Sequence, residues 1–236
     1  MTILMLLLCT IGQSPGGESD SFSPGFRIGF SFMTSFPSMQ NEKDFADMNT
    51  ASGLDFELGH IAFGGSLELL GDLSEKIRIR GSFGGSHFSG GYSEGYNVAE
   101  NMFMVLFTLG LISLSGEDEV IELDDQAITL EAQAYYFLSR TPKMSISVGA
   151  GPIYTFATRK LESPNTSTSG NGSGLGFVAS IRMDQESTFN LGCLPLMFGL
   201  EGGYRVNSVN ISNEEADDYE LDFSGPFVKV GSYIGI

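Results

Sequence analysis

The sequence has few cysteines, no long hydrophobic run and little positive charge, and each shortage limits what the chain can be. Its two cysteines are Cys9 and Cys193. Because Cys9 lies in a segment that we expect to be removed, a disulfide framework is excluded for the mature protein. No apolar run reaches the roughly 18 residues that a transmembrane helix needs. The 12 basic residues stand against 29 acidic ones, for a net charge of −17, which disfavours nucleic acid as a partner.

A short apolar block stands at the start of the sequence. Residues Ile3 to Ile11 (ILMLLLCTI) are followed by small and turn-forming residues in Gly12–Gly16 (GQSPG). This order is typical of a secretory signal peptide, although a buried N-terminal strand is the alternative. We therefore expect residues 1–14 to be a signal segment and residues 22–236 to form a single domain.

The strongest signal in the rest of the chain is the alternation of apolar residues with small or polar ones. In the first alternating segment, Phe26, Ile28 and Phe30 share one face, while Arg27 and Gly29 share the other. Alternation with a period of two is typical of β-strands with one apolar face. Eight such segments are present, with clear alternation beginning near Phe26, Ile61, Ile77, Ile128, Met144, Leu175, Leu196 and Val228.

The connectors between these segments alternate in length. Gly71–Glu75 and Ser139–Lys143 are short, and the link from Asp184 to Asn190 is moderately short. The long connectors are Pro37–Ser52, Ser89–Glu122, Thr158–Gly172 and Asn207–Glu220. Short turns at one rim and long loops at the other are typical of transmembrane barrels. We predict an all-β fold, an eight-stranded antiparallel up-and-down transmembrane β-barrel with long extracellular loops.

The composition of the two faces indicates which one meets lipid. The polar face consists mostly of Gly, Ser and Ala, which suits the narrow lumen of an eight-stranded barrel better than contact with water. Charges on this face could pair across the lumen, as buried charges must. We predict a polar network in the lumen from Arg27, Glu68, Arg78, Arg80, Glu131, Arg182, Glu201, Arg205 and Lys229. A soluble barrel with an apolar interior is the alternative.

Three segments resemble the outer-membrane β-barrel domain family, the OmpA-like and OmpW-like eight-stranded barrels. They are Ser147–Tyr154 (SVGAGPIY), Phe198–Arg205 (FGLEGGYR) and Gly231–Ile236 (GSYIGI), the last of which is similar to a C-terminal insertion signal. The resemblance implies a porin-like architecture in the outer membrane of a Gram-negative cell envelope. It also implies outer-membrane lipid and the barrel-assembly machinery as partners. Because the sequence lacks Trp, any aromatic girdles would come from Tyr and Phe.

Acidic residues gather in two of the predicted loops, at Glu117–Asp125 and Glu214–Asp222. Clustered carboxylates could recruit divalent cations at an anionic outer leaflet, although charge runs are usually solvated loops. The sequence shows no metal-ligand spacing and no nucleotide fingerprint. We therefore predict no cofactor and no metal site.

The longest predicted loop contains an apolar segment, Met102–Leu114 (MFMVLFTLGLISL). As a short helix it would be apolar on all sides, which forbids full exposure to water. It could plug the barrel mouth, dip into the outer leaflet or extend a strand. The alternative is a vestibule for a small hydrophobic ligand, as OmpW-like barrels suggest. In that case Met102, Phe103, Leu106 and Phe107 would line it.

One motif raises an enzymatic alternative. His87-Phe88-Ser89 resembles the His-Ser pair of PagL-type lipid A deacylases, and a His two residues from a Ser on one strand points to the same face. We predict a non-enzymatic outer-membrane barrel with a structural or surface-interaction role and a side-chain-filled lumen. Binding or transport of hydrophobic molecules is the alternative, and lipid A deacylase-like hydrolysis at His87 and Ser89 is a more remote one.

Overall fold

The computed structural model describes residues 25–38, 57–58, 61–92, 121–163, 166–191, 194–212 and 219–235. Three features expected from the sequence lie outside these residues. They are the signal segment 1–14, the segment Met102–Leu114 with its short helix, and the acidic residues 117–119 and 214–218. Within the described ranges, no helix is long and apolar enough to cross a membrane.

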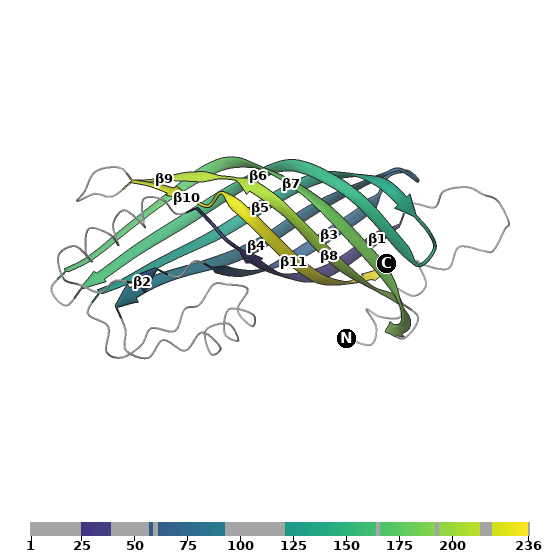
Figure 1. Cartoon of the computed structure of the whole chain (residues 1–236), viewed down its shortest axis with the longest axis horizontal. Coiled ribbons are helices and arrows are strands. Elements are labelled where there is room, and N and C mark those ends of the chain that lie inside the picture. Colours follow the sequence, from purple (N-terminus) through teal and green to yellow (C-terminus); the bar gives the residue numbers. More distant parts are fainter. Residues whose placement is uncertain are drawn as a thin grey trace, which may run out of the picture.

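The described residues form strands that pair antiparallel throughout (Figure 1). The strands are β1 (Phe26–Ser35), β2 (Glu57–Leu58), β3 (Ala62–Asp72), β4 (Ile77–Tyr92), β5 (Ile121–Arg140), β6 (Met144–Ser163), β7 (Thr166–Leu191), β8 (Leu194–Val206), β9 (Ser208–Ser212), β10 (Tyr219–Asp222) and β11 (Gly225–Gly235). Eight of them close a ring in the order β1, β3, β4, β5, β6, β7, β8 and β11, and β11 pairs with β1. The predicted eight-stranded antiparallel barrel is confirmed.

The outer face of the ring carries a continuous apolar band. Phe83 and Leu130 expose 47% and 46% of their surface, and Leu200 and Val230 expose 46% and 53%. The same band includes Ile28, Phe32, Leu67, Leu69, Ile79, Val148, Phe177, Ile181, Phe198 and Val228. An apolar surface that surrounds the whole wall is stable only in hydrocarbon. The apolar face therefore meets lipid, as predicted, and the polar face lines the lumen.

The wall continues well beyond this apolar band. β6 and β7 have 20 and 26 residues, about twice the 9–11 residues that a tilted strand needs to cross a bilayer. In their upper parts the outward side chains are polar, as at Lys160, Ser169 and Asn171, and β9 likewise exposes Ser208 and Asn210. The barrel therefore carries an extracellular extension, which we define as the polar upper parts of β4–β7 together with β2, β9 and β10.

The extension corrects the predicted connectors. Residues assigned to the loop Thr158–Gly172 lie in β6 and β7, apart from 164 and 165. The predicted loop Asn207–Glu220 contains β9 and the first two residues of β10. The predicted loop Ser89–Glu122 begins and ends in strand. At the opposite, periplasmic end, the predicted link at Asp184–Asn190 belongs to β7. The sequence prediction was wrong here for two reasons. The upper part of β7 is small or polar on both faces, so the alternation that marks a lipid-facing strand disappears. β9 and β10 have only five and four residues, which is too short for a clear alternation.

Candidate functional site in the barrel lumen

A layer of buried ion pairs crosses the middle of the lumen, with Arg80 of β4 at its centre. Arg80 Nη2 donates to Glu131 Oε2 of β5 at 2.9 Å, and Arg80 Nη1 lies 3.6 Å from Glu68 Oε1 of β3. The same guanidinium donates to Glu201 of β8. One arginine thus contacts carboxylates from three different strands.

Two further cations complete this central layer. Arg182 Nη1 of β7 lies 3.3 Å from Glu68 Oε2 and 3.5 Å from Glu201 Oε2. Lys229 Nζ of β11 lies 3.3 Å from Glu131 Oε2 and 3.4 Å from Glu68 Oε1. The central layer, defined as Glu68, Arg80, Glu131, Arg182, Glu201 and Lys229, therefore balances three carboxylates with three cations. Each of these residues is at least nine-tenths buried.

Neutral donors supply further hydrogen bonds to the same carboxylates. Tyr233 donates to Glu68 Oε2 at 2.8 Å, and Ser31 donates to Glu68 Oε1 at 2.7 Å. Tyr135 donates to Glu201 Oε1 at 3.0 Å. Buried carboxylates need such partners because they lose their hydration. The two tyrosines are not among the residues predicted for the lumen network, although both occupy inward positions in their strands.

A second charged cluster lies at the mouth formed by the short turns, which is the periplasmic end of the barrel. Its centre is Asp72, the last residue of β3. Arg27 Nη1 lies 3.1 Å from Asp72 Oδ2, Arg140 Nη2 lies 2.6 Å from the same oxygen, and Arg78 Nε lies 2.6 Å from Asp72 Oδ1. Arg78 also pairs with Asp184 of β7. The predicted residues Arg27 and Arg78 thus belong to this cluster at the mouth.

A β-bulge aims Arg140 into the mouth. The inward residues of β5 are odd-numbered up to Phe137, so Arg140 would face outward in a regular strand. The register with β6 shifts between Phe137 and Ser139, and one extra residue reverses which side chains point inward. The guanidinium of Arg140 then lies 4.6 Å from the centre of the Phe137 ring. Arg140 falls within the connector Ser139–Lys143 that the sequence predicts, so alternation along the strand does not identify it.

Above the central layer, the interior combines apolar side chains with buried polar ones, among them Asp125, Thr155 and Asn207. Arg205 Nη2 lies 2.8 Å from the sulfur of Met33, and its guanidinium lies 5.6 Å from the centre of the Phe227 ring. Arg205, one of the residues predicted for the lumen network, is therefore buried in the lumen but lies outside the central layer as defined above. Higher still, a buried cluster forms the interior of the extension, from Ala62, Phe88, Ala127, Ala157, Val209, Ile211, Leu221 and Phe223.

The enzymatic alternative rested on His87 and Ser89. His87 is buried, and its Nδ1 lies 3.1 Å from Asp124 Oδ1 of β5. Ser89 pairs with Asp124 in the register of β4 and β5, but its side chain lies outside the described part. The predicted ligand segment with Met102, Phe103, Leu106 and Phe107 also lies outside it. Among the described residues, no group of three or more His, Cys, Asp or Glu side chains is arranged to hold a metal ion.

Comparison with solved structures relates the fold to known proteins. The chain is similar to the outer membrane protein OprG of Pseudomonas aeruginosa, with a TM-score of 0.50 and 12% sequence identity over 91% of this chain and 96% of that one. The fold is that of an outer-membrane β-barrel. This fold, together with the apolar band around the outer wall, agrees with the predicted outer-membrane location. A scan of protein-family models and a search of curated proteins find no match.

Two other outer-membrane barrels show weaker similarity. A major outer membrane protein of Thermus thermophilus has a TM-score of 0.47 and 11% identity, over 91% of this chain and 100% of that one. Ail, the attachment invasion locus protein of Yersinia pestis, has a TM-score of 0.43 and 13% identity, over 90% and 97% of the two chains. At these identities the likeness concerns the fold alone.

Proposed function

We propose that this protein is a non-enzymatic outer-membrane barrel with a closed lumen and a structural or surface-interaction role. The observation that carries this proposal is the central layer, in which six charged side chains from β3, β4, β5, β7, β8 and β11 meet across the lumen. An eight-stranded barrel is only wide enough to be filled by side chains. The layer fills it at the level of the apolar band.

The energetics of the central layer also favour closure. A channel at this level would have to separate carboxylates from cations that are almost fully buried. Loss of one partner from a buried ion pair typically costs about 3–5 kcal/mol, because the other charge remains without compensation. Thermal motion therefore opens such a layer only rarely, and general diffusion is not the function that the geometry supports.

The extension supports a role outside the cell. β6 and β7 rise beyond the apolar band, and their outward side chains, such as Thr158, Ser169 and Ser173, are short and polar. A rigid hydrogen-bonded wall above the membrane presents these side chains in fixed positions. Such a wall is suited to contact with other molecules at the cell surface, while the closed barrel below anchors it.

Binding of small hydrophobic molecules is a second candidate, favoured by an apolar cluster inside the extension. Phe88, Ile211, Leu221 and Phe223 belong to one buried cluster there, and an apolar interior is the usual environment of such a ligand. A variant with Phe103→Asp and Phe107→Asp tests whether the longest loop takes part in binding the ligand. If this variant takes up hydrophobic ligands as well as the wild type does, the loop does not contribute to their binding.

Ion conductance across planar lipid bilayers tests the main proposal. We expect no steady conductance from the reconstituted wild-type protein. The double variant Arg80→Ala, Glu131→Ala removes two side chains of opposite charge from the central layer and should create a measurable conductance. The double variant Glu75→Ala, Lys76→Ala is the matched control, because it removes one charge of each sign from an exposed turn. A steady wild-type conductance equal to that of the Arg80 and Glu131 variant would contradict closure.

A further inference from the structure

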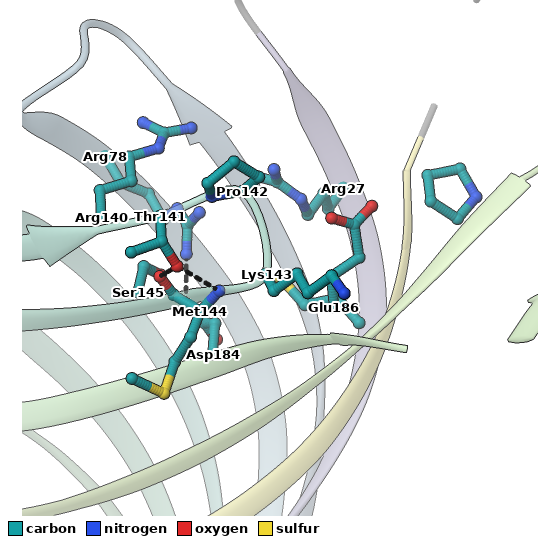
Figure 2. A pocket seen from close by; sticks show the side chains of 12 residues that line it. Arg27, Arg78, Arg140, Thr141, Pro142, Lys143, Met144, Ser145, Asp184 and Glu186 are labelled. Atoms are coloured by element: carbon teal, nitrogen blue, oxygen red, sulfur yellow. Dashed lines mark hydrogen bonds and ion pairs between the residues drawn. The ribbon is translucent and has the colours of Figure 1, made fainter. Parts of the chain in front are cut away.

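The periplasmic mouth contains a recess in which basic groups outnumber acidic ones. The recess has a volume of about 170 Å³ and is lined by Arg27, Arg78, Arg140 and Lys143, with Asp184 and Glu186 among the other lining residues (Figure 2). Asp72 lies behind the three arginines and contacts each of them. Four cations thus stand near three carboxylates, and one of these, Asp184, also accepts a hydrogen bond from Arg182 Nε of the central layer at 2.8 Å.

Among the described residues, two of these arginines use only part of their donors in the cluster, and both reach its open side. A guanidinium has five N–H donors. Arg27 and Arg140 each use one nitrogen to contact the same oxygen, Asp72 Oδ2. Their side chains remain 23% and 32% exposed, whereas Asp72 is 1% exposed. Asp72 therefore holds both guanidinium groups from behind and leaves part of each facing the recess.

The arginines are also held rigidly. The Phe137 ring contacts two guanidinium groups, with Arg78 at 4.8 Å and Arg140 at 4.6 Å from its centre. The bulge after Phe137 turns Arg140 toward the lumen, as described above. An aromatic ring and a buried carboxylate fix these groups before any ligand arrives, which lowers the entropy cost of binding. Bulges that redirect a side chain in this way are common next to functional sites.

We propose that this recess binds a phosphate group through Arg27, Arg140 and Lys143. Planar guanidinium groups bind phosphate oxygens with two N–H donors each, and a lysine adds a point charge. The recess is smaller than the roughly 300 Å³ of a drug-sized pocket, which suits a small acidic group. Leu73 and Leu138, which are 57% and 61% exposed on the neighbouring turns and strand end, place the mouth at the headgroup level of the inner leaflet.

Binding of inorganic phosphate to the purified full-length protein in a neutral detergent tests this site. Isothermal titration at low ionic strength should show saturable binding by the wild type. Arg140→Gln and Arg27→Gln should each weaken binding at least tenfold. Lys76→Gln is the matched control, because Lys76 is an exposed cation in a turn at the same end but does not line the recess. Its affinity should equal that of the wild type.

A second variant distinguishes a lost binding site from a failure to fold. Phe137→Leu keeps every charge but removes the ring between Arg78 and Arg140, so it should weaken phosphate binding while the barrel still forms. The absence of saturable phosphate binding by the folded wild type would overturn the proposal. Equal affinities of the wild type, Arg140→Gln and Phe137→Leu would overturn it as well, because the phosphate would then be bound elsewhere.

Reconstitution distinguishes a phospholipid headgroup from free phosphate as the source of the group. In nanodiscs of phosphatidylcholine alone, the affinity for inorganic phosphate should equal that in detergent if free phosphate is the ligand. If anionic headgroups occupy the recess, the inclusion of phosphatidylglycerol should weaken the apparent affinity of the wild type. Lys76→Gln should respond like the wild type in both membranes. Either result supports the phosphate site and identifies its source.

Discussion

The ring of Tyr233 occupies the space in which a side chain at Gly29 would lie. The two residues face each other in the register of β11 and β1, and a Cβ atom at position 29 would overlap the tyrosine ring. Because residue 29 has no side chain, the ring can cross the neighbouring strand and its hydroxyl can donate to Glu68. Gly149 and Tyr135 repeat this relationship on β6 and β5, and Tyr135 donates to Glu201.

Gly29→Ala should therefore destabilise the barrel. The added methyl group would displace the Tyr233 ring and its hydrogen bond to Glu68, and overpacking of this kind typically costs about 1–3 kcal/mol. The control is Gly81→Ala, since no atom lies within 4 Å of a Cβ atom at that position. The free energy of unfolding, measured by urea titration in lipid vesicles, should fall for the first variant and stay nearly constant for the second. Equal values for the two variants would contradict this account.

Arg80→Met should destabilise the barrel more strongly. It leaves three buried carboxylates with two cations in the central layer, and an uncompensated buried charge typically costs about 3–5 kcal/mol. The double variant Arg80→Met, Glu131→Gln restores the balance and should recover part of the loss. Lys76→Met on the exposed turn should change the unfolding free energy by less than about 0.5 kcal/mol. A double variant less stable than Arg80→Met would argue against charge balance as the cause.

Phe137→Leu should reduce stability through loss of contact with two guanidinium groups. Cation–π contacts of this kind contribute about 0.5–2 kcal/mol each, depending on desolvation. Phe156→Leu provides the comparison, because Phe156 is 48% exposed on the outer face and its replacement keeps an apolar side chain in lipid. If both variants unfold at the same urea concentration, the Phe137 contacts do not stabilise the mouth.

Asp222 should make the extension sensitive to acid. It lies on β10 above the apolar band, where burial works to raise its pKa. Hydrogen bonds from Ser224 and Ser38 outweigh burial and hold the pKa of Asp222 below its ordinary value. A lowered folded-state pKa contributes stability above the ordinary pKa of about 4 and loses it as the pH falls through the folded-state value.

The comparison of wild type with Asp222→Asn measures this contribution. The wild type should be more stable at pH 7, and the difference should shrink as the pH falls below about 4. Hydrogen exchange of the amides of β9 and β10 gives the local stability of the extension. A difference that is equal at pH 7 and at pH 3 would show that the charge of Asp222 is not responsible.

Alternation along the sequence was sufficient to predict the ring of strands and the face that meets lipid. It succeeded where one face is apolar, as in the residues around Phe83, Leu130 and Val230. It failed in the upper part of β7, which is polar or small on both faces and resembles a loop in composition, and in β9, whose five residues are too few to show a clear period. Above the membrane, backbone pairing with neighbouring strands holds these residues, and no side-chain pattern records that pairing.

Some residues of the candidate site could likewise be predicted from alternation, and others could not. Glu68, Arg80 and Glu131 could be assigned to the lumen because they follow the inward series of their strands. Asp72 continues the same series from Glu68 but was read as part of a turn. Arg140 could not be found by counting, because the bulge after Phe137 reverses the alternation and is visible only in the register with β6.

The account depends most on the direction in which alternate side chains point. Nitroxide spin labels placed singly from Ile128 to Phe137 on β5 would measure this in lipid bilayers. We predict that labels at even-numbered positions are accessible to oxygen dissolved in the lipid, whereas labels at odd-numbered positions are shielded from it. High oxygen accessibility at positions 129, 131, 133 and 135, with low accessibility at 130, 132, 134 and 136, would contradict the lipid-facing band and the ion-paired lumen together.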